Sequence, residues 1–80
     1  MRLSQVVKDV KSAREFIKEN KIEPEYFSCI YYDMSDRIDS FSTVSLKDIK
    51  DNLEVCYGED SLKEIIIVWE ETKWKKKIDN

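Results

Sequence analysis

The sequence has no histidine among its 80 residues, and it has one glycine and one proline. Without histidine, the usual catalytic triads and most zinc sites are excluded, together with the commonest general base of enzymes. One glycine is too few for the glycine-rich loops that bind phosphate groups. Such low glycine and proline contents also argue against a disordered chain. We therefore expect an ordered protein that is not an enzyme and needs no cofactor.

Cysteines and long apolar segments are also scarce. Cys29 and Cys56 lie far apart and form no Cys-x-x-Cys motif, which excludes a thiolate zinc site and a thioredoxin-like redox centre. One disulfide is possible, but no secretory signal is visible, so we favour isolated thiols in a reducing compartment. The longest apolar run, Ile65 to Trp69, is too short to span a bilayer. The expected location is the cytoplasm, without a membrane partner.

The length allows one domain, which we place at residues 1–80, with residues 1–2 and 75–80 as ends that can fray. A chain this short buries only about 60% of the surface that its unfolded form exposes, so its stability is small. Dimerisation is a common remedy, and we expect a homodimer. The formal net charge of -3 argues against a strongly basic nucleic-acid binder, so nucleic acid is not the expected partner.

Hydrophobic spacing and capping residues predict the first four elements. A helix is expected from about Ser4 to Asn20, because apolar residues recur at helical spacing there. Strands from Tyr26 to Asp33 and from Ile38 to Val44 follow, joined by a hairpin turn at residues 34–37. Ser45 begins a second helix, with Asp48 as the acid of a capping box. Gly58 ends this stretch in a left-handed conformation.

The last element, within residues 61–74, is ambiguous. Ser61 to Glu64 matches a capping box, and the apolar residues that follow fit helical spacing. The β-branched run Ile65 to Val68 suits a sheet better, so we predict a strand from about Glu64 to Thr72. A right-handed crossover would place this strand beside the first one. The predicted fold is α+β, in the order helix-strand-strand-helix-strand, with a three-stranded sheet (order 2-1-3) and two helices on one face.

Two helices can cover only one face of this predicted sheet. The residues expected beneath the helices are Phe27, Cys29, Tyr31, Ile66 and Val68. The residues expected on the opposite face are Tyr26, Ile30, Tyr32, Ile65, Ile67 and Trp69. Aromatic and aliphatic patches of this kind usually mark interfaces, so we expect a protein partner there unless the tail or a displaced helix covers the patch.

Charged residues form three groups. Asp33, Asp36 and Asp39 lack the glycine and glutamate of an EF-hand loop, so we interpret them as solvated turn acids and expect no metal site. A second acidic group surrounds Gly58 and consists of Glu54, Glu59, Asp60 and Glu64. These acids form either a polar loop or a set of carboxylates that replace DNA phosphates in a partner's basic groove. The tail Lys73-Trp74-Lys75-Lys76-Lys77 interleaves an aromatic ring with cations, as in binders of single-stranded nucleic acid, or is a solvated end.

Three short runs carry a family resemblance: Ser45-Leu46-Lys47-Asp48, Glu54-Val55-Cys56-Tyr57-Gly58 and Glu64-Ile65-Ile66. Together they resemble the small uracil-DNA glycosylase inhibitor of Bacillus podoviruses, over about residues 26–71. Members of that family are dimers that occupy the enzyme's DNA-binding cleft with acidic edges and an aromatic plug. The resemblance implies that Glu54 and Tyr57 contact the enzyme. Leu53 stands at the plug position, where the family has a phenylalanine, and the amino-terminal helix is additional.

These features together predict a small acidic inhibitor of the phage or mobile-element type. It would block a host nucleic-acid-processing or defence enzyme as a DNA mimic, with uracil-DNA glycosylase as the named candidate and a CRISPR effector as another target. One alternative is an immunity or antitoxin-like protein that neutralises a basic partner. Another is a single-stranded nucleic-acid binder that uses the basic tail. The predicted protein-binding residues are Leu53, Glu54, Tyr57, Glu59, Asp60, Tyr26, Ile30, Tyr32 and Trp69.

Overall fold

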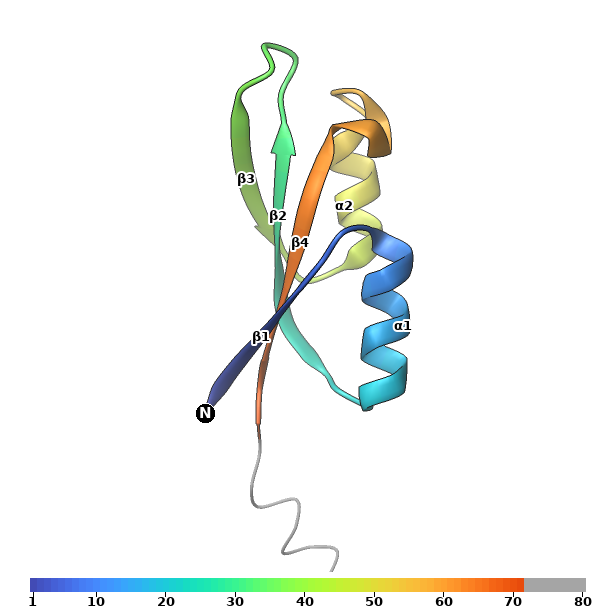
Figure 1. Cartoon of the computed structure of the whole chain (residues 1–80), viewed down its shortest axis with the longest axis vertical. Coiled ribbons are helices and arrows are strands. Elements are labelled where there is room, and N and C mark those ends of the chain that lie inside the picture. The colour runs from blue at the N-terminus through green and yellow to red at the C-terminus, as the bar shows by residue number, and fades with distance from the viewer. Residues whose placement is uncertain (72–80) are drawn as a thin grey trace, which may run out of the picture.

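A computed structural model describes residues 1–71, which form one antiparallel sheet and two α-helices (Figure 1). The strands are β1 (Arg2–Val7), β2 (Pro24–Tyr32), β3 (Ile38–Thr43) and β4 (Leu62–Glu70), in the order β1-β4-β2-β3. Helices α1 (Val10–Asn20) and α2 (Leu46–Leu53) lie on the same side of the sheet (Figure 1). A short 3-10 turn, η1 (Gly58–Ser61), leads into β4. Within residues 1–71 no helix covers the opposite face.

The predicted α+β class with two helices is confirmed, but the strand count and the strand order were wrong. The segment expected to begin the first helix forms β1, which pairs with the edge of β4 and makes a fourth strand. Leu3 and Val7 are four residues apart, a spacing that places them on one face of a helix and also on one face of a strand. The helix begins only after Asp9, whose carboxylate accepts a hydrogen bond from the Ser12 N–H at 2.7 Å.

The remaining elements follow the predicted chain order. β2 pairs with β3 through a hairpin and with β4 on its other edge, and the ambiguous last element is a strand. Gly58 adopts the expected left-handed conformation, with φ of 67°. Ser45 caps α2 by accepting a hydrogen bond from the Lys47 N–H at 3.2 Å. The capping box is modified, because the Asp48 carboxylate accepts from the Thr43 hydroxyl at 2.9 Å, and that hydroxyl accepts from the Ser45 N–H.

The hydrophobic core fills the space between the helices and the sheet. Its fully or nearly fully buried members are Val10, Ala13, Phe27, Cys29, Ile49, Leu53, Ile65 and Ile67. Phe27 and Cys29 lie beneath the helices as predicted, which leaves Tyr26, Ile30 and Tyr32 on the opposite face. Trp69 extends the core along β4, where its ring lies 5.6 Å from the ring of Phe16 on α1.

The predicted orientation of the last strand was wrong. Ile67 lies opposite Phe27 and Ile65 lies opposite Cys29 in the β2–β4 ladder, so both isoleucines face the helices. Ile66 and Val68 therefore point to the opposite face. A shift of one residue exchanges the two faces of a strand, and a run with apolar residues at every position gives no alternation by which to choose between them. No helix among residues 1–71 is long and apolar enough to cross a membrane.

Candidate protein-binding surfaces

The face of the sheet opposite the helices is the first candidate surface, called here the open face. The strand registers bring fourteen residues to it: Arg2, Ser4, Val6, Tyr26, Ser28, Ile30, Tyr32, Ile38, Ser40, Ser42, Glu64, Ile66, Val68 and Glu70. A shallow hollow of about 560 Å³ lies on it, with Ile66 and Val68, the hydroxyls of Ser28 and Ser42, and Tyr26 in its lining. The open face therefore combines an apolar centre with hydroxyl groups.

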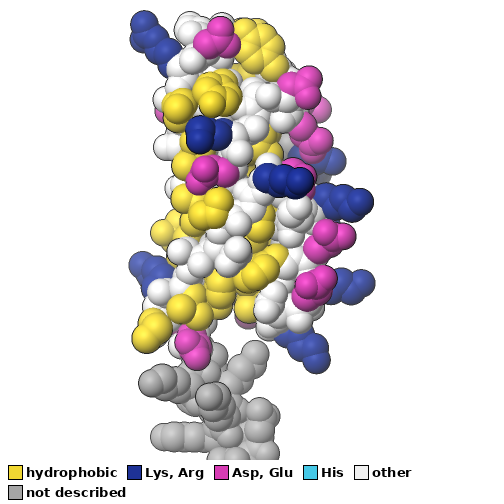
Figure 2. Space-filling view, viewed as in Figure 1, with side chains coloured by type: hydrophobic (Ala, Val, Ile, Leu, Met, Phe, Trp, Pro, Cys, Tyr) yellow, Lys and Arg dark blue, Asp and Glu magenta, His cyan; other side chains and the backbone are white. Residues whose placement is uncertain are grey.

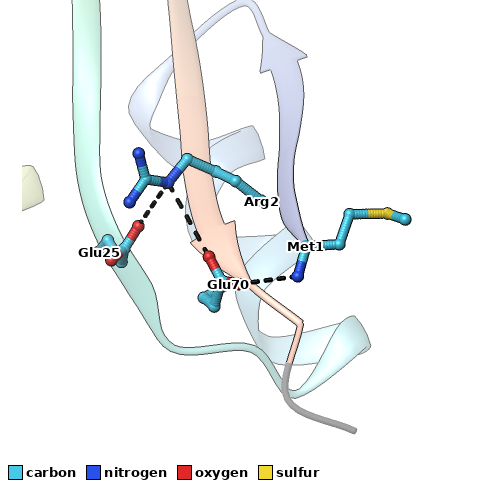
Figure 3. Close-up of polar contacts among 4 residues, drawn as sticks. All are labelled: Met1, Arg2, Glu25 and Glu70. Carbon is cyan, nitrogen blue, oxygen red and sulfur yellow. Dashed lines mark hydrogen bonds and ion pairs between the residues drawn. The ribbon is translucent and has the colours of Figure 1, made fainter.

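Charged side chains occur only at the margins of the open face. Arg2 lies at one end, where its guanidinium contacts the carboxylates of Glu25 at 3.0 Å and Glu70 at 4.0 Å (Figure 3). The Met1 ammonium donates a hydrogen bond to Glu70 at 2.8 Å, which is the main cause that lowers the pKa of that carboxyl. Glu64, near the other end, lies 3.9 Å from the ammonium of Lys63. Each marginal charge thus has an opposite charge beside it.

The second candidate surface is the end of the molecule where the β2–β3 hairpin meets the loop after α2 (Figure 1). The hydroxyl of Tyr57 donates a hydrogen bond to the carbonyl of Met34 at 2.9 Å and so joins the two segments. We call this surface the acidic end, defined by Asp33, Met34, Asp36, Asp39, Glu54, Tyr57, Glu59 and Asp60. Six of these eight residues are acids, and the cations in the same segments are few: Arg37 in the hairpin, and Lys50, 3.9 Å from Glu59.

The acids of the acidic end differ in what they do. Asp33 has a structural role, because its carboxylate accepts hydrogen bonds from the backbone N–H groups of Ser35 at 2.7 Å and Arg37 at 3.0 Å. The other five are exposed. Large apolar side chains are exposed beside them, since Met34 is 62% and Tyr57 49% accessible. The acidic end therefore offers both charged and apolar side chains to solvent.

Most of the predicted protein-binding residues lie on these two surfaces. Glu54, Tyr57, Glu59 and Asp60 belong to the acidic end, and Tyr26, Ile30 and Tyr32 belong to the open face. Figure 2 shows the contrast between the two sides of the molecule, with charged side chains crowded along the helices and apolar ones more frequent along the sheet.

Two predicted contact residues are wrongly placed. Leu53 is completely buried because it follows Ile49 by one helical turn on the inner face of α2, so it cannot act as a plug for a partner's pocket. Trp69 lies beneath the helices against Phe16 and is absent from the open face. The predicted nucleic-acid-binding residues Lys73, Trp74, Lys75, Lys76 and Lys77 lie outside the described residues.

Sequence reasoning missed two parts of these surfaces. It treated the hairpin acids and the acids around Gly58 as separate groups, because the Tyr57–Met34 hydrogen bond joins residues 23 apart in the chain. Local spacing contains no signal for such a contact. It also left out Val6, Ile66 and Val68, since it read β1 as a helix and inverted the faces of β4.

Two titratable groups of strand β2, the Cys29 thiol and the Tyr31 hydroxyl, have raised pKa values. Burial raises the pKa of the Cys29 thiol to about 11, so this group stays protonated at neutral pH and is a poor nucleophile. Burial, followed by the nearby Asp39 carboxylate, raises the pKa of Tyr31. Within residues 1–71 no three side chains are grouped to hold a metal ion.

Comparisons with protein-family models, curated proteins and solved structures find no match to this chain.

Proposed function

We propose that this protein is a small acidic inhibitor that binds a nucleic-acid-processing enzyme with its acidic end. The observation that carries the proposal is the Tyr57–Met34 hydrogen bond, which fixes two acidic segments side by side. Carboxylates held in a fixed arrangement can take the place of DNA phosphates in a basic groove. The exposed side chains of Met34 and Tyr57 add apolar contact area at the same place.

The charge distribution supports this choice of partner. Residues 1–71 contain sixteen acidic and ten basic side chains, and six of the acids belong to the acidic end. A surface potential of this sign attracts a basic partner and raises the rate of association. It repels DNA and RNA, so the acidic end is suited to compete with nucleic acid for an enzyme rather than to bind nucleic acid.

Uracil-DNA glycosylase is the first target to test, because Glu54 and Tyr57 of the family resemblance are both exposed at the acidic end. The buried position of Leu53 means that any insertion into the enzyme's base pocket must use another side chain. Met34, which is 62% accessible, is the candidate at the acidic end, because Tyr57 is held by its hydrogen bond to the Met34 carbonyl. A CRISPR nuclease is the second target, since it also holds nucleic acid in a basic channel.

The experiment measures uracil excision and guided DNA cleavage while the protein is titrated in. We expect inhibition of one of these reactions by the unchanged chain. The double variant Glu54→Lys, Asp60→Lys should raise the apparent inhibition constant by about tenfold or more, because it reverses two charges at the contact. Glu15→Lys, Glu19→Lys is the matched control, since it makes the same charge change at exposed positions on α1.

Three results would contradict the proposal. Undiminished activity of both enzymes in a large molar excess of this protein would show that it inhibits neither of them. Equal loss of inhibition in the two double variants shows that overall charge matters and that the acidic end does not. Neutralisation of a basic toxin by this protein, with both nucleic-acid enzymes unaffected, would instead make the acidic end the binding surface of an immunity protein.

A further inference from the structure

We infer that the open face is the interface of a homodimer, in which a second copy of the chain covers it. This inference goes beyond the proposed function, because it concerns a different surface and a different partner. Its first support is the composition of the open face. The chain has 39% charged residues, yet the fourteen residues of the open face include only Arg2, Glu64 and Glu70 as charges, all at the margins.

The uncharged residues of the open face include two tyrosines, a residue type in which protein interfaces are enriched, together with apolar side chains and four serines. Its centre consists of Val6, Ile66, Val68, Tyr26 and Ile30, surrounded by serines. Depletion of charge at the core of a patch and enrichment in tyrosine distinguish interfaces from ordinary surface. Val6 is 53% and Ile38 61% accessible, whereas Val68 is only 6% accessible. The apolar area available to a partner therefore lies mainly on the edge strands β1 and β3, and the half-buried Tyr26, Ile30 and Ile66 add to it.

Electrostatics select a second copy of the chain as this partner. The acids of the helices and of the acidic end would repel their own counterparts if two copies met there. On the open face, by contrast, two acidic molecules can meet with uncharged centres in contact. A nucleic acid would need cations, and the one cation among the fourteen residues of the open face, Arg2, already contacts Glu25 and Glu70.

Symmetry then favours one arrangement of the two copies. A two-fold axis that runs along the strands between two stacked sheets places β4 of one copy over β2 of the other. Glu64 then faces Ile30 of the partner's β2, and Glu70 lies at the margin, beyond the partner's Tyr26. A two-fold axis across the strands would instead bring β4 over β4, with the acid at one end of that strand over the acid at its other end.

The available area is sufficient for a weak but specific dimer. Four strands about 4.8 Å apart, with six to nine residues at about 3.3 Å each, give roughly 500 Å² of sheet surface per copy. Two copies therefore bury about 1,000 Å² or more, which is close to the lower limit for a specific interface. We expect a dissociation constant in the micromolar range.

The test is sedimentation equilibrium of the full chain over a wide range of concentrations, with no target enzyme present. The unchanged chain should reach the mass of a dimer. Ile66→Glu should remain folded by circular dichroism and shift the dissociation constant at least tenfold, as should Val6→Glu at the exposed edge strand. Gln5→Glu is the matched control, because Gln5 is exposed on the same edge strand as Val6 but lies on the helix side of the sheet.

A second measurement separates an interface effect from a folding defect. An equimolar mixture of the Ile66→Glu and Ile66→Lys chains should form dimers more readily than either chain alone, because the introduced charges attract across the interface. An unchanged chain that stays monomeric at millimolar concentration overturns the inference. A dimer that persists in Ile66→Glu and in Val6→Glu, or that weakens equally in Gln5→Glu, also overturns it. None of these results depends on whether the acidic end inhibits an enzyme.

Discussion

Cys29 and Cys56 show how strongly the position of a residue changes its chemistry. Cys29 lies in the core with no accessible surface, and burial raises the pKa of its thiol from 9.0 to about 11. Cys56 is only half-buried and lies in the loop after α2, next to Tyr57 of the acidic end. Thiol reactivity needs both the thiolate and access for the reagent, and Cys29 has neither.

This difference predicts the result of thiol labelling at neutral pH. The folded protein should react with one equivalent of Ellman's reagent at Cys56, and the second equivalent should appear only when denaturant unfolds the chain. Absorbance of the released chromophore measures both phases. The Cys56→Ser variant serves as the control and should lose the first phase alone. Two thiols that react at the same rate in the native protein would contradict the buried position of Cys29.

At the scale of one element, α2 links the core to the acidic end. Its inner face buries Ile49 and Leu53, and the next residue, Glu54, begins the exposed acidic loop. The helix has only eight residues, so its stability depends on its cap as well as on packing. Ser45, Thr43 and Asp48 form that cap through three hydrogen bonds.

The cap gives a prediction for stability. Ser45→Ala removes the oxygen that accepts from the Lys47 N–H, and we expect the free energy of unfolding to fall by about 1 kcal/mol. Urea unfolding followed by circular dichroism measures this change. Ser35→Ala, at an exposed position in the β2–β3 turn, is the control and should change stability by less than about 0.5 kcal/mol. Equal effects of the two substitutions would show that the cap contributes nothing.

The sequence predicts elements whose signals are local. Ser45 and Gly58 mark the ends of the segment around α2, and the aromatic run in β2 followed by a short turn indicates the hairpin. Two other features depend on distant partners. β1 forms a strand because its backbone pairs with the free edge of β4. Which side chains of β4 face the helices is set by the register of β4 with β2. The exposure of Tyr57 was predictable from its place in a polar loop. Its hydrogen bond to Met34 was not, because the two residues are 23 positions apart in the chain.

At the scale of the whole molecule, the two surfaces use opposite physical forces. The acidic end attracts a basic partner by charge, and the open face brings two copies together through uncharged contacts. With the two-fold axis along the strands, both acidic ends lie at the same end of the dimer. They repel each other there, so the dimer is weakened by the same charges that would bind the target.

Salt should therefore act on the two interactions in opposite directions. The Debye length falls from about 10 Å at 0.1 M salt to about 3 Å at 1 M, so added salt screens both the repulsion within the dimer and the attraction to the enzyme. We expect the dissociation constant of the dimer to stay constant or fall over this range, while the inhibition constant rises by tenfold or more. Sedimentation equilibrium and the inhibition assay measure the two constants in the same buffers. A dimer that dissociates as salt rises would mean that ion pairs such as Arg2 with Glu70 hold the two copies together, and it would contradict an interface formed by the uncharged centre of the open face.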